Sequence, residues 1–212
     1  MDAEDASAEG ELRQGRFGHV CVGEGDPFCD EGLPPSVFPE AFAVAARLDA
    51  TYVPDDDDPG ALPRVQPGSS VSIRPAGELG WIAARPGWAV WLAIDANDDV
   101  VDLRHVRLAE VDAIAVATDE VDDLARLALA PGDRIELAAT PEDAGGRALG
   151  GSLTYAWAVE GEDVVELVSV ATRRTVTLEA LEVGTARLHV SAAGVTRTLD
   201  VLVDEPRHGG GE

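Results

Sequence analysis

Tyr155-Ala-Trp157 opens the stretch that decides the fold of this chain. The stretch continues through Asp163-Val-Val-Glu-Leu167 and Val176-Thr-Leu-Glu-Ala-Leu-Glu-Val-Gly184-Thr-Ala-Arg-Leu-His-Val190, and it ends in Gly194-Val-Thr-Arg-Thr-Leu-Asp-Val-Leu-Val203. Apolar and polar residues alternate in each segment, which is typical of a strand with one face in a core and the other in water. Four such strands in succession predict an antiparallel β-sandwich whose core holds Tyr155, Trp157 and Leu188.

The first half of the chain repeats this pattern in a more degenerate form. When Gly87 is aligned with Gly184, Trp81 falls on Leu178 and small and large residues alternate alike on both sides of the turn. We therefore predict an all-β protein with two tandem β-sandwiches. The expected division is an acidic leader and cysteine loop, largely irregular, over 1–35, a first sandwich over 36–110, a second over 111–204, and a flexible tail over 205–212.

Residues 127–203 resemble a bacterial immunoglobulin-like domain of the group 2 type. The resemblance rests on Leu129-Ala-Pro-Gly132, on the Trp157 and Asp163–Leu167 segments, and on Leu181-Glu-Val-Gly-Thr-Ala186 before a valine-rich last strand. Residues 64–108 resemble the same family more faintly, without a tryptophan at the position of Trp157. The whole arrangement is similar to exported lipoproteins of high-GC deltaproteobacteria. The resemblance implies two immunoglobulin-like sandwiches and leaves room for a lipid anchor, but the family serves in adhesins, surface enzymes and spacers alike.

The charge of the chain limits its partners. Its 212 residues carry a net charge of −24, and every basic residue is arginine. A GC-rich genome accounts for this composition, and a surface adapted to high salt is the alternative. In either case duplex nucleic acid and anionic lipid are repelled. No apolar run reaches the roughly 18 residues that span a bilayer, so we expect no direct membrane span.

The two cysteines, Cys21 and Cys29, lie in a segment rich in glycine and aspartate. Their even number and close spacing favour a disulfide, which implies an oxidising compartment. Free thiols and a metal pair remain as alternatives; His19 is a third metal ligand, but the sequence offers no convincing fourth. The residues after Met1, Asp-Ala-Glu-Asp, are the opposite of an export signal. Either the native chain is cytoplasmic or an export segment is absent from this sequence, and the cysteines favour export to the periplasm, the outer-membrane surface or the exterior.

An apolar outer face is expected on the first half. If residues 88–94 form one strand, Ala89, Trp91 and Ala93 point to one side, and the opposite side carries Trp88, Val90, Leu92 and Ile94. The equivalent outward positions of the second half are polar: Thr185, Arg187 and His189. Three covers for this face are open. They are the N-terminal segment with Phe17, Val20, Phe28 or Phe38; another domain or chain; and a sugar or other ligand stacked on Trp81 and Trp88.

Candidates for chemistry are few. Asp95, Asn97 and Asp99 have the spacing that begins a calcium loop, but Val100 stands where an EF-hand needs glycine, and a hairpin turn explains the segment equally well. The histidines lie in no nucleophile or metal motif; they are His19, His105, His189 and His208. We therefore expect no catalytic residues and no cofactor.

These observations predict a non-enzymatic, exported structural or adhesive protein. It would present immunoglobulin-like surfaces for contact with a protein partner, or for self-association, through the first half at the cell envelope or in an extracellular assembly. Two alternatives remain: a carbohydrate- or ligand-binding module that uses Trp81 and Trp88, and an accessory subunit of an enzyme complex.

Overall fold

The computed structural model describes residues 15–23, 25–29, 38–55, 62–68, 71–77 and 80–205. Within these ranges the regular structure consists of strands, so the all-β class predicted from the sequence is confirmed. No helix in the described ranges has the length and apolar character needed to cross a bilayer.

The first nine strands form three sheets. They are β1 (Gly15–His19), β2 (Ala41–Ala43), β3 (Arg47–Leu48), β4 (Ala50–Pro54), β5 (Arg64–Pro67), β6 (Ile73–Pro75), β7 (Trp81–Ala83), β8 (Gly87–Ile94) and β9 (Val100–Ala109). One sheet has the order β2-β9-β8-β5, the second has the order β3-β7-β6, and β1 pairs with β4 alone. Large apolar side chains fill the space between them: Phe42, Leu48, Tyr52, Trp91, Val106 and Leu108.

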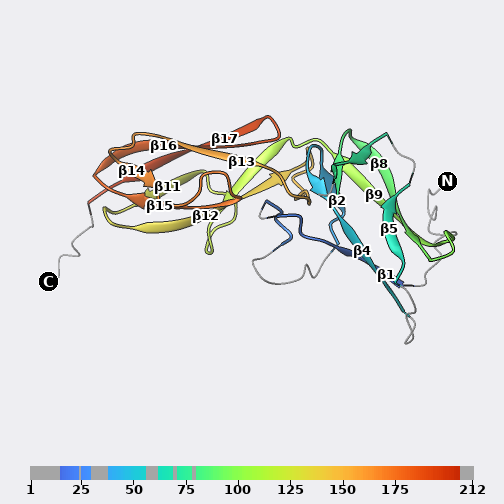
Figure 1. Cartoon of the computed structure of the whole chain (residues 1–212). Coiled ribbons are helices and arrows are strands. Elements are labelled where there is room, and N and C mark those ends of the chain that lie inside the picture. The colour runs from blue at the N-terminus through green and yellow to red at the C-terminus, as the bar shows by residue number, and fades with distance from the viewer. Residues whose placement is uncertain are drawn as a thin grey trace, which may run out of the picture.

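The last eight strands form two four-stranded sheets that face each other as a sandwich (Figure 1). They are β10 (Ala113–Ala117), β11 (Arg126–Leu129), β12 (Arg134–Glu142), β13 (Tyr155–Glu160), β14 (Val165–Leu167), β15 (Thr175–Ala180), β16 (Gly184–Ala192) and β17 (Val195–Val203). The sheet orders are β10-β12-β15-β14 and β11-β17-β16-β13. We call this body the C-terminal sandwich. Tyr155, Trp157 and Leu188 are buried between its sheets.

The two halves of the chain share a pattern of strand pairing. In the C-terminal sandwich the edge strand β11 runs parallel to β17, while β17, β16 and β13 are antiparallel neighbours. In the first half the edge strand β2 runs parallel to β9, while β9, β8 and β5 are antiparallel neighbours. The segments that the sequence aligns around Gly87 and Gly184 therefore lie in corresponding strands, β8 and β16.

Three local details differ from the sequence-based predictions. Residues 1–35 were expected to be largely irregular, yet β1 pairs with β4 because Phe17 and His19 alternate with more exposed neighbours and enter the core. The alternation of the sequence does not reveal that the largely apolar segment 42–48 is broken between β2 and β3 by a turn in which Ala45 has a φ of 71°. Ile94 was expected on the outer face. A bulge between Ala93 and Ile94 shifts the register, and Ile94 turns inward and is buried.

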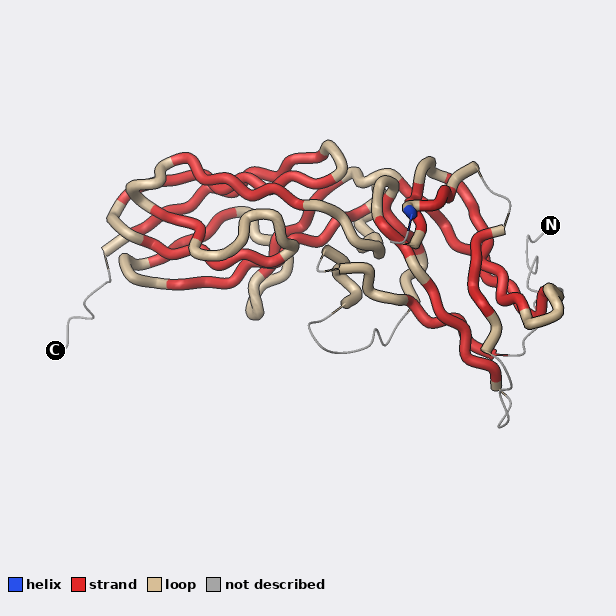
Figure 2. The backbone as a smooth tube through the Cα atoms, in the orientation of Figure 1, coloured by secondary structure: helices blue, strands red, loops and turns tan. Residues whose placement is uncertain are grey.

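The two groups of sheets lie end to end and are joined by main-chain hydrogen bonds (Figure 2). The segment between β12 and β13 reaches back to the first half, where Gly150 N donates to Ala41 O and Ala43 N donates to Gly150 O, each at 2.9 Å. Arg47 and Ser152 exchange two more bonds of 2.9 Å. One continuous cluster of buried apolar side chains runs through both halves. We call this contact zone the junction.

Candidate functional site

The outer side of the β2-β9-β8-β5 sheet carries an apolar patch that includes Trp88. Cross-strand partners in an antiparallel sheet share a face, and the register pairs Trp88 with Arg107, Val90 with His105, and Leu92 with Leu103 and Gln66. We call these seven residues the Trp88 face. Trp88 is 68% exposed, and it is the one exposed aromatic side chain among the residues that the structure describes.

The Trp88 face differs in charge from the rest of the chain. It contains His105 and Arg107 but no acidic residue, although the chain as a whole carries −24. Arg107 is paired with Asp143, and the same carboxylate also binds Arg147 at 2.9 Å. Two guanidinium groups therefore share one carboxylate at the edge of the face next to Trp88.

None of the N-terminal aromatic side chains covers Trp88. Phe17 packs edge-on against Tyr52 with ring centroids 5.0 Å apart, and Phe38 packs against Phe42 at 5.6 Å. Both Tyr52 and Phe42 belong to the core, so these contacts lie on the inner side of the sheets. Phe17 and Phe38 therefore do not provide the cover that was proposed from the N-terminal segment.

Trp81 and Trp88 are not brought together on one surface. Trp81 packs edge-on against Trp91, with ring centroids 6.4 Å apart, and Trp91 is buried. Trp88 points to the opposite side of β8, since the side chains of Trp88 and Trp91 alternate across the strand. A stacking platform would therefore have Trp88 as its only tryptophan.

The predicted disulfide between Cys21 and Cys29 is confirmed. It closes a short loop whose centre is tied to the C-terminal sandwich. Gly25 O accepts hydrogen bonds from Leu153 N at 3.4 Å and from the Tyr155 hydroxyl at 3.3 Å. A Cβ atom at position 25 would collide with the Leu153 carbonyl oxygen, so this close approach requires glycine.

Asp26 is the most strongly bonded residue of the disulfide loop. Its Oδ2 lies 2.6 Å from His19 Nε2 and accepts a hydrogen bond of 2.8 Å from Gly151 N, while Oδ1 accepts from Phe28 N at 2.9 Å. The side chains of both His19 and Asp26 are 1% exposed. Asp26 thus links β1, the disulfide loop and the junction through one buried carboxylate.

A second carboxylate, Asp143, supports the junction from the other side. The Arg107 guanidinium, followed by the main-chain N–H of Arg147 and of Gly145, holds the pKa of Asp143 well below its usual range. The side chain is 5% exposed and lies in the loop after β12, whereas Arg107 lies on β9. This ion pair therefore connects the two halves.

Acid should weaken the junction through Asp143. A carboxyl with a folded-state pKa below its unfolded value contributes stability above the unfolded pKa of about 4, and the contribution is lost as pH falls. We expect Asp143→Asn to lower the denaturation midpoint at pH 7, and the difference from wild type to shrink below about pH 4. Urea unfolding of both proteins gives the difference between their denaturation midpoints, which is compared at pH 7 and at pH 3. A difference that is equal at the two pH values would contradict the assigned role.

The expected calcium candidates form a turn. Asp95 Oδ1 accepts hydrogen bonds from Asn97 N at 2.8 Å and from Asp99 N at 2.9 Å, and these bonds lower the pKa of Asp95. The neighbouring Asp98 pairs with Arg64 at 2.7 Å. The Asp95 carboxylate is thus used to close the hairpin loop between β8 and β9, as the turn interpretation predicts.

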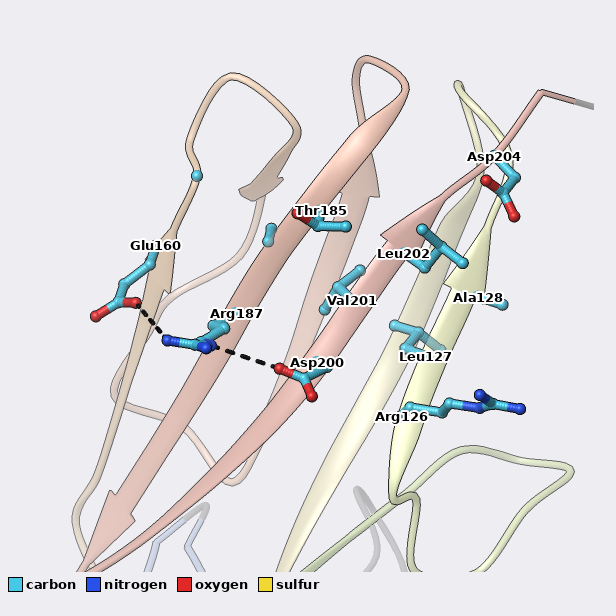
Figure 3. A pocket seen from close by; sticks show the side chains of 12 residues that line it. Arg126, Leu127, Ala128, Glu160, Thr185, Arg187, Asp200, Val201, Leu202 and Asp204 are labelled. Carbon is cyan, nitrogen blue, oxygen red and sulfur yellow. Dashed lines mark ion pairs between the residues drawn. The ribbon is translucent and has the colours of Figure 1, made fainter.

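A groove of about 870 Å³ crosses the outer side of the β11-β17-β16-β13 sheet (Figure 3). Arg187 lies at its centre between Asp200, at 3.5 Å, and Glu160, at 3.9 Å. These charges are exposed and neutralise one another, which is typical of a solvated sheet face. The groove corresponds in position to the Trp88 face of the first half but has the opposite chemical character.

The residues that sequence reasoning missed are buried polar groups. Asp26 and Asp143 are two of many acids in an acidic chain, and nothing in their spacing marks them. Glycine offered the only available signal: Gly25 precedes Asp26, and Gly145-Gly146 follows Asp143 by two residues. Such neighbours are common where an aspartate accepts hydrogen bonds from its own turn.

Comparison with known protein families and with curated proteins finds no match. Solved structures that align with this chain include domains 4 and 5 of the surface-layer protein SbsC, at 14% identity and TM-score 0.36, covering 66% of this chain and 74% of that one. InvD of Yersinia pseudotuberculosis aligns at 16% identity and TM-score 0.36, covering 77% and 55%. A β-glycosidase from Bacteroides vulgatus aligns at 17% and TM-score 0.35, covering 58% and 18%. Similarity at this level assigns no function, so the function has to be argued from the surfaces of this chain.

Proposed function

We propose that this chain is a non-enzymatic, exported structural or adhesive component that acts by protein–protein contact through the Trp88 face. The observation that carries the proposal is the 68% exposure of Trp88 on the same face as Val90 and Leu92. An exposed aromatic residue within an apolar patch is the usual anchor of a protein interface, because burying it removes a large apolar area from water. The corresponding face of the C-terminal sandwich is polar and charge-paired, which makes the difference specific to the first half.

The charge of the face indicates what kind of partner it fits. His105 and Arg107 lie beside Trp88 without an acidic neighbour on the face. A partner surface with an apolar centre and acidic residues around it complements this arrangement. A second copy of this chain is the first partner to test, since its net charge of −24 makes acidic surface abundant.

The fold and the location form part of the same proposal. We infer two tandem immunoglobulin-like sandwiches, supported by the shared pattern of one parallel edge pair and three antiparallel neighbours in each half. Export is supported by the Cys21–Cys29 disulfide, because such bonds persist in oxidising compartments. Joined by the junction, the two bodies would act as a spacer that carries the Trp88 face on its first half.

Trp88→Ser should remove the contact and leave the fold intact. We expect association to weaken roughly thirty-fold, the effect of losing an interface anchor worth about 2 kcal/mol. Sedimentation of the purified protein measures self-association. Pull-down from the native cell envelope, with wild type and with each variant as bait, measures the capture of another partner. Leu202→Ser is the matched control, because Leu202 is 42% exposed on the polar face of the C-terminal sandwich.

Two outcomes would overturn the proposal. One is that wild type and Trp88→Ser sediment alike and recover the same proteins. The other is a change in tryptophan fluorescence on titration with a polysaccharide that Trp88→Ser abolishes, which would favour the carbohydrate-binding alternative. Far-UV circular dichroism of both variants confirms that any loss of binding arises without loss of structure.

A further inference from the structure

The disulfide loop brings together more potential metal ligands than the sequence suggested. His19, Asp26 and Cys29 each offer one ligand atom, and these three atoms lie within 4.8 Å of one another. The Cys21 sulfur is bonded to that of Cys29 and is therefore next to this cluster. The sequence offered no convincing fourth ligand for a cysteine–histidine metal site, and the structure supplies one in Asp26.

We propose that the reduced, dithiol form of this loop binds Zn²⁺ through Cys21, Cys29, His19 and Asp26. Two thiolates, one imidazole and one carboxylate are ligands that zinc takes in tetrahedral sites. With Zn–S near 2.3 Å and Zn–N or Zn–O near 2.1 Å, ligand atoms of such a site are about 3.3–3.8 Å apart. To reach that spacing, the three atoms that lie within 4.8 Å of one another would draw together, and the two sulfurs would move apart once their bond is reduced.

The surroundings of the cluster orient its ligands. His19 Nε2 faces Asp26 Oδ2 at 2.6 Å, so a metal shared by these two side chains would be bound through Nε2; His19 Nδ1 has no hydrogen-bond partner among the described residues. Asp26 Oδ1 is held by Phe28 N, and Gly151 N also points at the carboxylate. Such hydrogen bonds to a ligating carboxylate fix its direction toward the metal.

Reduction of the Cys21–Cys29 disulfide to two thiols requires a two-electron reductant. A phosphine and one water molecule convert the disulfide into two thiols and leave as the phosphine oxide. Binding of Zn²⁺ then releases the two thiol protons, while His19 binds as a neutral imidazole through Nε2 with its one ring proton carried on Nδ1, and Asp26 binds as the carboxylate. The metal would close the same loop that the disulfide closes, so the bonds from Gly25 and Asp26 to the junction would persist in the reduced protein.

Cobalt titration of the full chain tests this proposal, independently of the role of Trp88. The protein is reduced with a phosphine under anaerobic conditions, freed of reductant and titrated with Co²⁺. We expect saturation at one equivalent, with a thiolate-to-cobalt charge-transfer band and the visible bands of tetrahedral cobalt, both removed by Zn²⁺. The oxidised protein should show neither band. Zn²⁺ should also raise the melting temperature of the reduced protein, because it binds the folded state.

Matched variants separate the four-ligand site from binding by the thiols alone. His19→Ala and Asp26→Asn should lose the tetrahedral spectrum or the one-equivalent saturation, while His105→Ala, at an exposed position, and Asp95→Asn, at a half-buried position away from the cluster, should keep both. Alkylation of both thiols in reduced wild type should abolish the bands without any substitution, which keeps the test valid if a variant fails to fold. The proposal is overturned if reduced wild type shows no bands, or if His19→Ala and Asp26→Asn retain the wild-type spectrum.

Discussion

Trp157→Ala should lower the free energy of unfolding of the C-terminal sandwich by about 3–5 kcal/mol, the range for truncating a buried tryptophan. The indole is 5% exposed between the two sheets, and its Nε1 donates a hydrogen bond of 2.9 Å to Arg173 O. Truncation removes the apolar contacts and leaves this carbonyl without its donor. A domain with a total stability of about 5–15 kcal/mol would lose a large part of it. Urea unfolding followed by far-UV circular dichroism measures the change.

Trp88 provides the control for this prediction within the same chain. Trp88→Ala removes the same number of atoms from a side chain that is 68% exposed, and substitutions at such positions usually change stability by less than about 0.5 kcal/mol. The unfolding midpoint of Trp88→Ala should therefore stay close to that of wild type. If the two alanine variants unfolded at the same urea concentration, the assignment of Trp157 to the core would be wrong.

The C-terminal sandwich follows closely from its sequence because its strands are long and alternate strictly. In β17, Leu199, Val201 and Val203 are buried while Asp200 and Leu202 are exposed, so period-two reading places each side chain correctly. Leu202 shows that one apolar residue on the outer face does not disturb the pattern. The parallel pairing of β11 with β17 is a long-range feature that no local pattern encodes.

The first half was harder to predict because its strands are short and irregular. The segment 42–48 contains enough apolar residues for one strand, but Ala45 adopts a positive φ and splits it. The bulge at Ala93 and Ile94 reverses the direction of Ile94 relative to strict alternation. The break at Ala45 depends on contacts with distant segments, since Ala43 N bonds to Gly150 O and Ala45 N bonds to Ala83 O.

The candidate functional site also has one part that the sequence predicts and one part that it does not. The placement of Trp88, Val90 and Leu92 on one side of β8 follows from alternation, because neighbouring residues in a strand point to opposite faces. The hydrogen bonds of Asp26 do not follow from the sequence, since Gly151, one of its partners, is 125 residues away. Charge and spacing therefore identify a surface more readily than they identify a buried polar contact.

Asp26→Ala should be the most damaging substitution outside the sandwich cores. It would leave His19 buried beside an empty space and would remove the acceptor of Gly151 N and of Phe28 N. Breaking a buried, hydrogen-bonded pair of this kind costs about 3–5 kcal/mol. The loss should appear first at the junction, because Gly25 and Asp26 together hold residues 151–155 against the first half. Hydrogen exchange at the amides of Gly151, Ser152 and Leu153 should accelerate before the amides of β16 do.

Asp95→Ala is the matched control, because Asp95 also accepts a main-chain hydrogen bond from the residue two positions ahead. The two aspartates share this local turn and differ in their tertiary contacts: Asp26 bonds across the junction, whereas Asp95 bonds only within its exposed loop. If the turn were what mattered, both variants would lose the same stability. If burial and the junction matter, Asp26→Ala alone should shift the urea midpoint and expose residues 151–153. Equal shifts, or an Asp26→Ala protein whose junction amides exchange as slowly as in wild type, would show that the two halves are held together without the disulfide loop.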